Sequence, residues 1–242
     1  MRFRALGPLR VWDGAAWSAI GAAHQRVVLA VLLAEAGRVV STDRLVFEIW
    51  GDRPPRTAAH AVQVYIGRLR RVLGPDGPLS TNGRGYQMVT AEDDLDANLF
   101  ERLVDSGTRS LTDGRLEPGV AALSEALALW RGPALADVPA GPTVAAEADR
   151  LEQRRLNAAE ARLGALLELG RAADIVDELR DLAERNPLRE RLHGQLMVAL
   201  YRTGRRSDAL GAAAAGHLCA QTVVFLLCAE TVERPCALMR IG

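Results

Sequence analysis

The segment from residue 56 to residue 74, RTAAHAVQVYIGRLRRVLG, carries four arginines and no acidic residue. Its apolar residues recur at the spacing of an amphipathic helix, so the segment predicts a helix with one basic face. A basic face without acids favours contact with phosphate groups. Soon afterwards the chain contains Asn82-Gly83-Arg84-Gly85-Tyr86, which predicts the turn of a β-hairpin. Together these segments predict the recognition helix and the wing of a DNA-binding domain.

The charge is divided unevenly along the 242 residues, although the formal net charge is zero. Residues 1 to 90 contain 12 arginines and 6 acids, a net of +6, whereas residues 91 to 242 contain 18 arginines and 24 acids, a net of −6. The length favours two domains. The charge distribution indicates that only the first domain meets nucleic acid.

Several chemistries are excluded by residues that the chain lacks. All 30 basic residues are arginine, so neither a Walker A lysine nor a Schiff-base lysine exists. The four histidines form no HExxH motif, and there is no Gly-x-Ser-x-Gly motif. We therefore expect no enzyme activity, no cofactor and no metal site, the last because the cysteines lack CxxC spacing: Cys219, Cys228 and Cys236. Residues 1 to 12 lack the apolar core of a signal peptide, which favours a cytoplasmic location.

The first 91 residues predict a small sheet, three helices and a final hairpin, which together make a winged helix-turn-helix. Short runs of alternating apolar and polar residues around an Asp-Gly turn predict the sheet. Apolar residues at helical spacing, followed by a glycine, predict the helices. Either Ser41 or Thr42 could cap the second helix. The predicted elements are the sheet in residues 3–20, helices in 24–36, from 41 or 42 to 50 and in 57–73, and the hairpin in 79–89.

The spacing within the third helix also predicts which face is buried. That face includes Ala61, Val62, Leu69, one of Tyr65 and Ile66, and one of Val72 and Leu73. In the hairpin, the alternation predicts that Tyr86 and Met88 pack against the domain.

Beyond about Glu92 the pattern predicts only helices. Gly170-Arg171 and Gly204-Arg205 lie 34 residues apart, which is the tetratricopeptide period. Gly114-Arg115 is a third such turn, out of period, and residues 144 to 169 predict one long helix. The predicted fold class is therefore mainly α with small β-sheets: a winged helix followed by an all-α, tetratricopeptide-like domain.

Long strings in both halves resemble the SARP family of actinobacterial regulators, which join an OmpR-like winged helix to a bacterial transcriptional activation domain. The resemblance covers about residues 1 to 210. The strings in the first half are Leu6-Gly7-Pro8, Gln25-Arg26, residues 45–51, residues 62–74 (VQVYIGRLRRVLG) and residues 83–86. Those in the second half are residues 127–132 (LALWRG), residues 151–155 (LEQRR) and residues 193–210.

The resemblance implies a DNA-binding transcriptional activator of secondary-metabolite genes. It implies binding to direct repeats in double-stranded promoter DNA, recruitment of RNA polymerase, and dimerisation or polymerase contact through the helical domain. It places the third helix in the major groove and the wing in the minor groove. Carried onto this chain, the base-facing residues are His60, Gln63, Val64 and Arg68, the phosphate contacts are Arg70 and Arg71, and the wing residue is Arg84.

Some of these roles have alternatives. A glutamine amide can pair with adenine, and Arg68 could pair with guanine or bind phosphate. Arg70 and Arg71 could instead be a solvated helix end. Asn82 stands where many such wings have arginine, so Arg84 could enter the minor groove or only contact the DNA backbone. Gly67 should cost the third helix about 1 kcal/mol relative to alanine unless close approach of DNA compensates.

The chain departs from the family near its end. Residues 209 to 229 contain no Asp, Glu or Arg, which favours a shifted reading frame or an abbreviated paralogue. A membrane span is the rival interpretation, and four residues in the stretch count against it: Gly216, His217, Gln221 and Thr222. The predicted domains are residues 1–91 (winged helix), 92–210 (activation domain) and 211–242 (divergent apolar tail).

One alternative function stays open. The helical repeats could bind a protein partner while the winged domain no longer binds specific DNA, because a fold does not fix a function. The acid-free basic segment from Arg56 to Arg71 favours DNA over this alternative.

Overall fold

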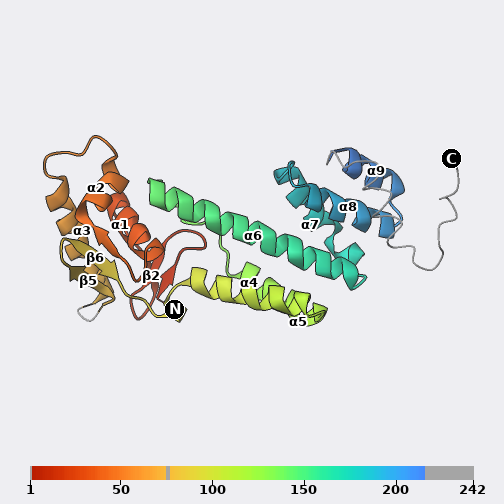
Figure 1. Cartoon of the computed structure of the whole chain (residues 1–242), viewed down its shortest axis with the longest axis horizontal. Helices are drawn as coiled ribbons and strands as arrows, with labels where there is room; N and C mark the ends of the chain where they lie inside the picture. Colours follow the sequence, from red (N-terminus) through yellow and green to blue (C-terminus); the bar gives the residue numbers. More distant parts are fainter. Residues whose placement is uncertain (1, 75–76, 216–242) are drawn as a thin grey trace. The chain divides into compact units, whose positions relative to one another are not determined.

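The computed structural model describes residues 2–74 and 77–215, and these form two compact units. The first unit consists of the described residues within 1–106 and 122–157, and the second consists of residues 107–121 with residues 158–215. Figure 1 shows the helices and strands of each unit. The divergent tail predicted from residue 211 lies, from residue 216 on, outside the described residues.

The N-terminal part of the first unit is a winged helix-turn-helix, as predicted. An antiparallel sheet, β1-β2-β3, comes first, followed by α1 and α2, the recognition-type helix α3, and the wing. The second sheet has the order β4-β6-β5. The elements are β1 (Phe3–Arg4), β2 (Arg10–Trp12), β3 (Trp17–Ala19), α1 (Ala23–Ala34), β4 (Val39–Ser41), α2 (Thr42–Trp50), α3 (Ala58–Leu73), β5 (Leu79–Asn82) and β6 (Gly85–Met88).

Strand β4 was missed by the sequence prediction. Its three residues pair antiparallel with β6, from Val39 opposite Gln87 to Ser41 opposite Gly85. Gly85 is required at this crossing, because a Cβ there would lie 2.5 Å from the carbonyl oxygen of Val40. The wing is therefore a three-stranded sheet that includes residues from the start of the helix-turn-helix.

A capping side chain and a glycine determine the two ends of α2. Ser41, one of the two predicted caps, accepts a hydrogen bond from the backbone N–H of Arg44. Gly51 ends the helix with a φ of +58°, a conformation that favours glycine.

The prediction that Tyr86 and Met88 pack inward is confirmed, since both are buried. The buried residues of α3 are Ala58, Val62, Ile66, Leu69 and Leu73, so Ile66 and Leu73 point inward in place of Tyr65 and Val72. The prediction that Ala61 is buried was wrong, because Ala61 is only partly buried.

After the winged helix the described chain is helical, as predicted. The elements are a 3-10 turn, η1 (Glu92–Asp94), and helices α4 (Asp96–Thr112), α5 (Leu116–Ala128), α6 (Pro142–Glu168), α7 (Ala172–Arg185), α8 (Glu190–Arg202) and α9 (Arg206–Ala215). Helix α6 confirms the long helix predicted for residues 144 to 169.

The three Gly-Arg turns end their helices in the same way. Gly114, Gly170 and Gly204 all have a φ between +75° and +79°. In each turn the arginine N–H that follows bonds to the carbonyl oxygen five residues back, and the glycine N–H bonds to the carbonyl three residues back. This is the Schellman arrangement, so the glycines end α4, α6 and α8.

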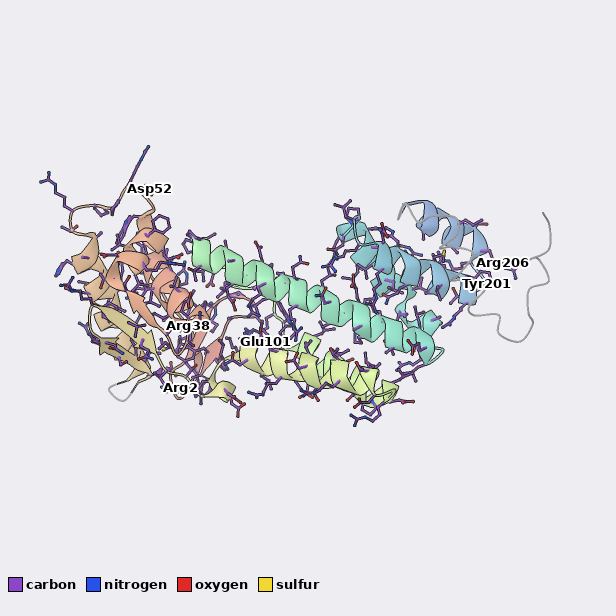
Figure 2. The ribbon with its side chains drawn as sticks, viewed as in Figure 1. Arg2, Arg38, Asp52, Glu101, Tyr201 and Arg206 are labelled. Carbon is purple, nitrogen blue, oxygen red and sulfur yellow. The ribbon has the colours of Figure 1, made fainter. Side chains whose placement is uncertain are left out.

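At the last of these turns, the guanidinium of Arg206 lies over the ring of Tyr201, 5.8 Å from its centroid (Figure 2).

A buried carboxylate joins the N-terminal sheet to the start of the helical region within the first unit. Asp96, at the start of α4, is 1% exposed. It accepts hydrogen bonds from the backbone N–H groups of Ala5 at 2.6 Å and Leu6 at 3.3 Å, and from Arg131 Nη2 at 2.8 Å. Every oxygen of this carboxylate is therefore hydrogen-bonded, which is the condition for burying such a charge.

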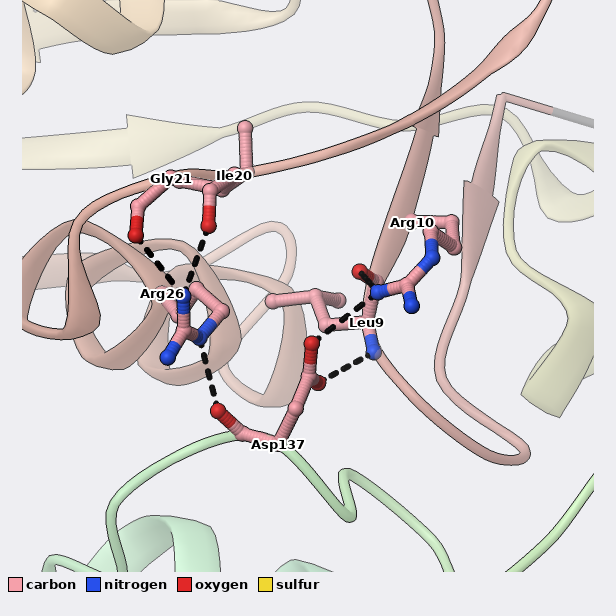
Figure 3. Close-up of polar contacts among 6 residues, drawn as sticks. All are labelled: Leu9, Arg10, Ile20, Gly21, Arg26 and Asp137. Atoms are coloured by element: carbon pink, nitrogen blue, oxygen red, sulfur yellow. Dashed lines mark hydrogen bonds and ion pairs between the residues drawn. The ribbon is translucent and has the colours of Figure 1, made fainter.

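Asp137 makes a second junction of the same kind (Figure 3). Its carboxylate accepts from the Leu9 backbone N–H at 2.7 Å and from Arg10 Nη1 at 2.9 Å. Its backbone carbonyl accepts from Arg26 Nε at 2.6 Å, and Arg26 Nη1 also donates to the carbonyl of Ile20. One residue of the α5–α6 loop therefore contacts both the N-terminal sheet and α1.

Glu48 of α2 makes the third junction. Its side chain is fully buried and accepts from the Thr143 backbone N–H at 3.0 Å and from Arg44 Nε at 2.9 Å. The Thr143 hydroxyl donates to it as well. Glu48 thus satisfies the free N–H of Thr143 in the first turn of α6. Gly141 permits this approach, because a Cβ there would lie 2.6 Å from Glu48 Oε2.

Among the described residues, no helix combines the length and the apolar character needed to span a membrane.

Replacing Asp96 should test the first junction. In Asp96→Ala two backbone N–H groups and Arg131 lose their acceptor, so we expect the free energy of unfolding to fall by about 3 kcal/mol or more. Asp113→Ala is the control, because Asp113 pairs with Arg115 at the exposed surface. It should cost less than about 1 kcal/mol. Urea denaturation measures both, and equal losses would contradict a structural role for Asp96.

The pH dependence of stability should also reflect Asp96. Burial raises the pKa of Asp96 above its ordinary value of 3.8, against the opposing effects of the Ala5 N–H and of Arg131. A raised pKa in the folded state means that protonation favours folding. This stabilisation is complete below the unfolded pKa and is lost as pH rises through the folded pKa.

The asparagine in Asp96→Asn does not titrate in this pH range, so this variant lacks the pH-dependent contribution of Asp96. The unfolding free energy of the wild type minus that of Asp96→Asn should therefore fall as pH rises from about 4 and then level off. Urea titrations over this range measure the difference. A difference that grows with pH would mean that pairing with Arg131 outweighs burial.

Candidate nucleic-acid interface

Helix α3 begins after a proline-containing loop and carries no acid in its first turn. The loop runs from Gly51 to Thr57, and the N–H of Ala58 bonds to the carbonyl of Pro55 at its end. The last turn contains Arg70 and Arg71, where cations are favoured by the helix dipole.

The solvent-facing side of α3 is a continuous stripe at helical spacing. Apart from a half-exposed glycine its residues are exposed, and the stripe lies opposite the buried residues that pack on α1 and α2. The stripe consists of His60, Gln63, Val64, Gly67, Arg68 and Arg71. Among the residues that the structure describes, neither Arg68 nor Arg71 makes a hydrogen bond or an ion pair within the protein. These two guanidinium groups are therefore free to meet an anion.

Gly67 lies in the middle of this stripe. It is half-exposed, and a Cβ built on it would meet no atom within 4 Å. The protein itself therefore does not require a glycine here. A flat point in the helix surface allows another molecule to approach the backbone closely.

Contacts with both preceding helices hold α3 in place. His24 Nδ1 of α1 lies 3.2 Å from the hydroxyl of Tyr65 in α3. The His24 ring also packs edge-on against Trp50 of α2, with ring centroids 5.5 Å apart. One histidine therefore contacts the other two helices of the helix-turn-helix.

The wing presents Arg84 at the tip of its turn. Gly83, with a φ of +57°, makes the turn between β5 and β6. The carbonyl of Arg84 accepts from the Thr42 N–H at 3.3 Å and from the Thr42 hydroxyl at 3.2 Å, whereas its side chain is exposed. The turn is thus tied to the start of α2 through the backbone, and the guanidinium faces solvent.

Arg70 differs from the other arginines of α3 because it binds the wing. Its Nη2 donates to Thr81 Oγ1 at 2.6 Å and its Nε donates to the carbonyl of Leu79 at 3.4 Å. The sequence offered no signal for this contact. The phosphate role predicted for Arg70 stays a prediction, and the side chain would have to serve both partners or exchange them.

The other predicted site residues are exposed to solvent. His60, Gln63, Val64, Arg68 and Arg71 share the exposed stripe, and Arg70 links this helix to the wing that carries Arg84. Their roles toward bases or phosphates stay predictions. Thr42 and Thr81, which hold the wing, were missed, because hydrogen bonds between elements distant in sequence leave no periodic pattern.

In the described part of the chain, no group of three or more His, Cys, Asp or Glu residues is placed to hold a metal ion.

A winged helix with a basic exposed face on α3, followed by a helical domain, defines an OmpR-type regulator architecture. Two family models match the chain: "Transcriptional regulatory protein, C terminal" over residues 21–88 and "Bacterial transcriptional activator domain" over residues 95–214. The chain belongs to the SARP family of transcriptional regulators, as the resemblance predicted. This is a family of regulators and not of enzymes.

Known relatives match most of the chain. Regulatory protein DnrI of Streptomyces peucetius is 39% identical over 222 residues, which covers 88% of this chain and 82% of DnrI. Regulatory protein AfsR of Streptomyces griseus is 40% identical over 210 residues, which covers 87% of this chain. The chain spans only 21% of AfsR.

A solved structure has the same fold. EmbR of Mycobacterium tuberculosis, in complex with a low-affinity phosphopeptide, superposes with a TM-score of 0.86 at 31% identity. The superposition covers 97% of this chain and 65% of that one.

Removing the Arg70 side chain should loosen the wing. In Arg70→Ala the hydrogen bonds to Thr81 and Leu79 are lost, so we expect faster amide hydrogen exchange in β5 and β6. Global stability should change by less than about 1 kcal/mol, because the contact is exposed. Arg71→Ala removes the same charge without a wing contact and should leave the exchange unchanged. Identical exchange in the two variants would show that Arg70 does not position the wing.

Proposed function

We propose that this chain is a sequence-specific transcriptional regulator that binds promoter DNA with α3 in the major groove and the wing in the minor groove. The observation that carries the proposal is the exposed stripe of α3, which contains two arginines without partners among the described residues and no acid. An α-helix fits the major groove, and such a surface suits the phosphates at its edges.

The side chains of the stripe suggest a division of roles. Gln63 can read adenine through its amide, and Arg68 can read guanine with two hydrogen bonds. His60 and Val64 would contact bases beside them. Arg71, in the last turn of α3, would bind phosphate, and Arg84 would enter the minor groove or contact the DNA backbone there.

For the assembly on DNA, we propose binding to direct repeats and activation by recruitment of RNA polymerase. The family membership supports both, and secondary-metabolite genes are the targets that the family implies. Dimerisation through the helical domain would place two winged helices on adjacent half-sites. Footprinting after genome-wide mapping of bound DNA would measure the half-site spacing.

The alternative is a protein-interaction module in which the helical domain binds a partner and the winged helix binds no specific DNA. Both alternatives use the same fold. They differ in the expected effect of arginine substitutions on α3.

Two arginine variants separate sequence reading from phosphate binding. Arg68→Ala should weaken binding to the specific site by about 1–3 kcal/mol and relax the preference at one base pair. Arg71→Ala should weaken binding to all sequences and reduce the slope of log K against log salt by about 1. Gel shifts with the region upstream of the gene, at several salt concentrations, measure both.

Arg185→Ala is the matched control. Arg185 is an exposed arginine of α7, outside the winged helix, so its loss lowers the net charge equally. It should leave both the affinity and the salt slope unchanged. If Arg68→Ala and Arg71→Ala behave like this control, DNA binding through α3 is wrong and the interaction-module alternative gains support.

A further inference from the structure

The exposed stripe of α3 is uncharged and apolar at its centre. Val64 and Gly67 lie there three residues apart, so they are neighbours on the helix surface. Val64 is 38% exposed, and Gly67 is half-exposed and has no side chain. Each member of this pair has a longer polar side chain four residues before it and another four residues after it: His60, Gln63, Arg68 and Arg71. The centre of the stripe is therefore an apolar surface that is lower than its polar surroundings.

Packing inside the protein explains neither residue of this pair. A Cβ built on Gly67 would meet no atom within 4 Å, whereas a Cβ on Gly119 of α5 would collide with the Leu111 side chain. A glycine in the interior of a helix is less favourable than an alanine, so helix stability does not favour Gly67. The pair lies in the middle of the surface that faces DNA in the proposed complex, which connects it with recognition.

Only one base presents an apolar group to this surface. In the major groove, guanine, cytosine and adenine offer hydrogen-bond donors and acceptors, whereas thymine adds its C5-methyl group. Apolar side chains recognise thymine through contact with this methyl. A helix surface without a side chain also allows the groove to come close to the backbone.

We infer that Val64 and Gly67 select a thymine through its C5-methyl group, which lies on the Gly67 backbone and against the Val64 side chain. The inference rests on the proposed function, because it requires α3 to lie in the major groove. It adds a specificity-determining position at which an absent side chain, instead of a hydrogen bond, selects the base. A cytosine in the same place has no methyl group, so this contact would be lost.

Deoxyuridine isolates this contact, because it differs from thymidine only by the missing methyl group. The probe is a duplex that the full chain selects from a pool of random sequences. Each thymine of the selected site is then replaced in turn by deoxyuridine, and fluorescence anisotropy measures the Kd. At one or more thymines of each half-site we expect roughly fourfold weaker binding, which corresponds to the loss of one buried methyl-sized group.

Two substitutions in α3 should remove the preference for thymine over deoxyuridine. Gly67→Ala places a methyl group where the thymine methyl would lie, so this variant should bind both duplexes equally or prefer deoxyuridine. Val64→Ala removes the apolar side chain and should reduce the ratio of the two Kd values to below about twofold. Gly67→Ala should be at least as stable to heat as the wild type, because alanine favours a helix.

Val72→Ala is the matched control. Val72 is another exposed valine of α3, 43% exposed, and it lies outside the stripe. Its replacement should leave the roughly fourfold preference unchanged. Loss of the preference in this variant would overturn the inference, because the effect would then not depend on the centre of the stripe.

The failure of the inference can be distinguished from the failure of the proposed function. A selected site at which no thymine methyl affects the Kd, or an unchanged preference in Gly67→Ala, would overturn the inference and leave sequence-specific binding intact. If the selection enriches no sequence, the proposed function is wrong and the inference falls with it.

Discussion

The hydrogen bonds to the buried carboxylate of Asp96 are the interaction on which the architecture of the first unit depends. Asp96 begins α4, yet two of its partners are backbone N–H groups next to β1 and the third is Arg131 in the α5–α6 loop. A carboxylate removed from water is tolerated only with such partners, and removing one partner leaves a buried charge uncompensated. The start of α4 therefore cannot move away from the N-terminal sheet without a large cost in free energy.

Asp137 and Glu48 apply the same constraint at two other points of the first unit. Gly141, which has no side chain, precedes Pro142 at the start of α6, so no side chain at the cap position can accept from the Thr143 N–H. Glu48, from the middle of α2, supplies the acceptor instead. The position of α2 and the start of α6 consequently determine each other. The winged helix and the helices that follow it, up to residue 106 and from 122 to 157, form one compact unit for this reason.

Periodicity predicted the elements well but not these junctions. The helices, the hairpin turn at Gly83 and the long helix α6 follow from local spacing, caps and glycines, all of which are visible in a short window. Asp96, Asp137 and Glu48 are acids, and an acid in an amphipathic pattern predicts exposure. The backbone N–H groups that they bind are 90 to 128 residues away in the sequence. Strand β4 was missed because its three residues form a strand only when β6 is beside them.

The candidate DNA-binding surface was likewise predicted only where local spacing determines it. Helical spacing placed His60, Gln63, Val64, Arg68 and Arg71 on one exposed face, since exposure of a stripe follows from burial of the opposite one. The orientation of the wing could not be predicted, because it depends on Thr42 and Arg70, which bond to groups on other elements.

The contacts that hold α3 and the wing in place reduce the free-energy cost of binding DNA. Binding costs less when the contact surface is already ordered, because fewer side chains and loops lose freedom on association. In this chain α3 is fixed to α1 and α2 through His24, and to the wing through Arg70. The backbones that would carry the reading side chains are therefore held before DNA arrives, and the ordering cost falls on exposed side chains such as Gln63, Arg68, Arg71 and Arg84. Charge on an ordered scaffold of this kind favours sequence discrimination over indiscriminate attraction to phosphate.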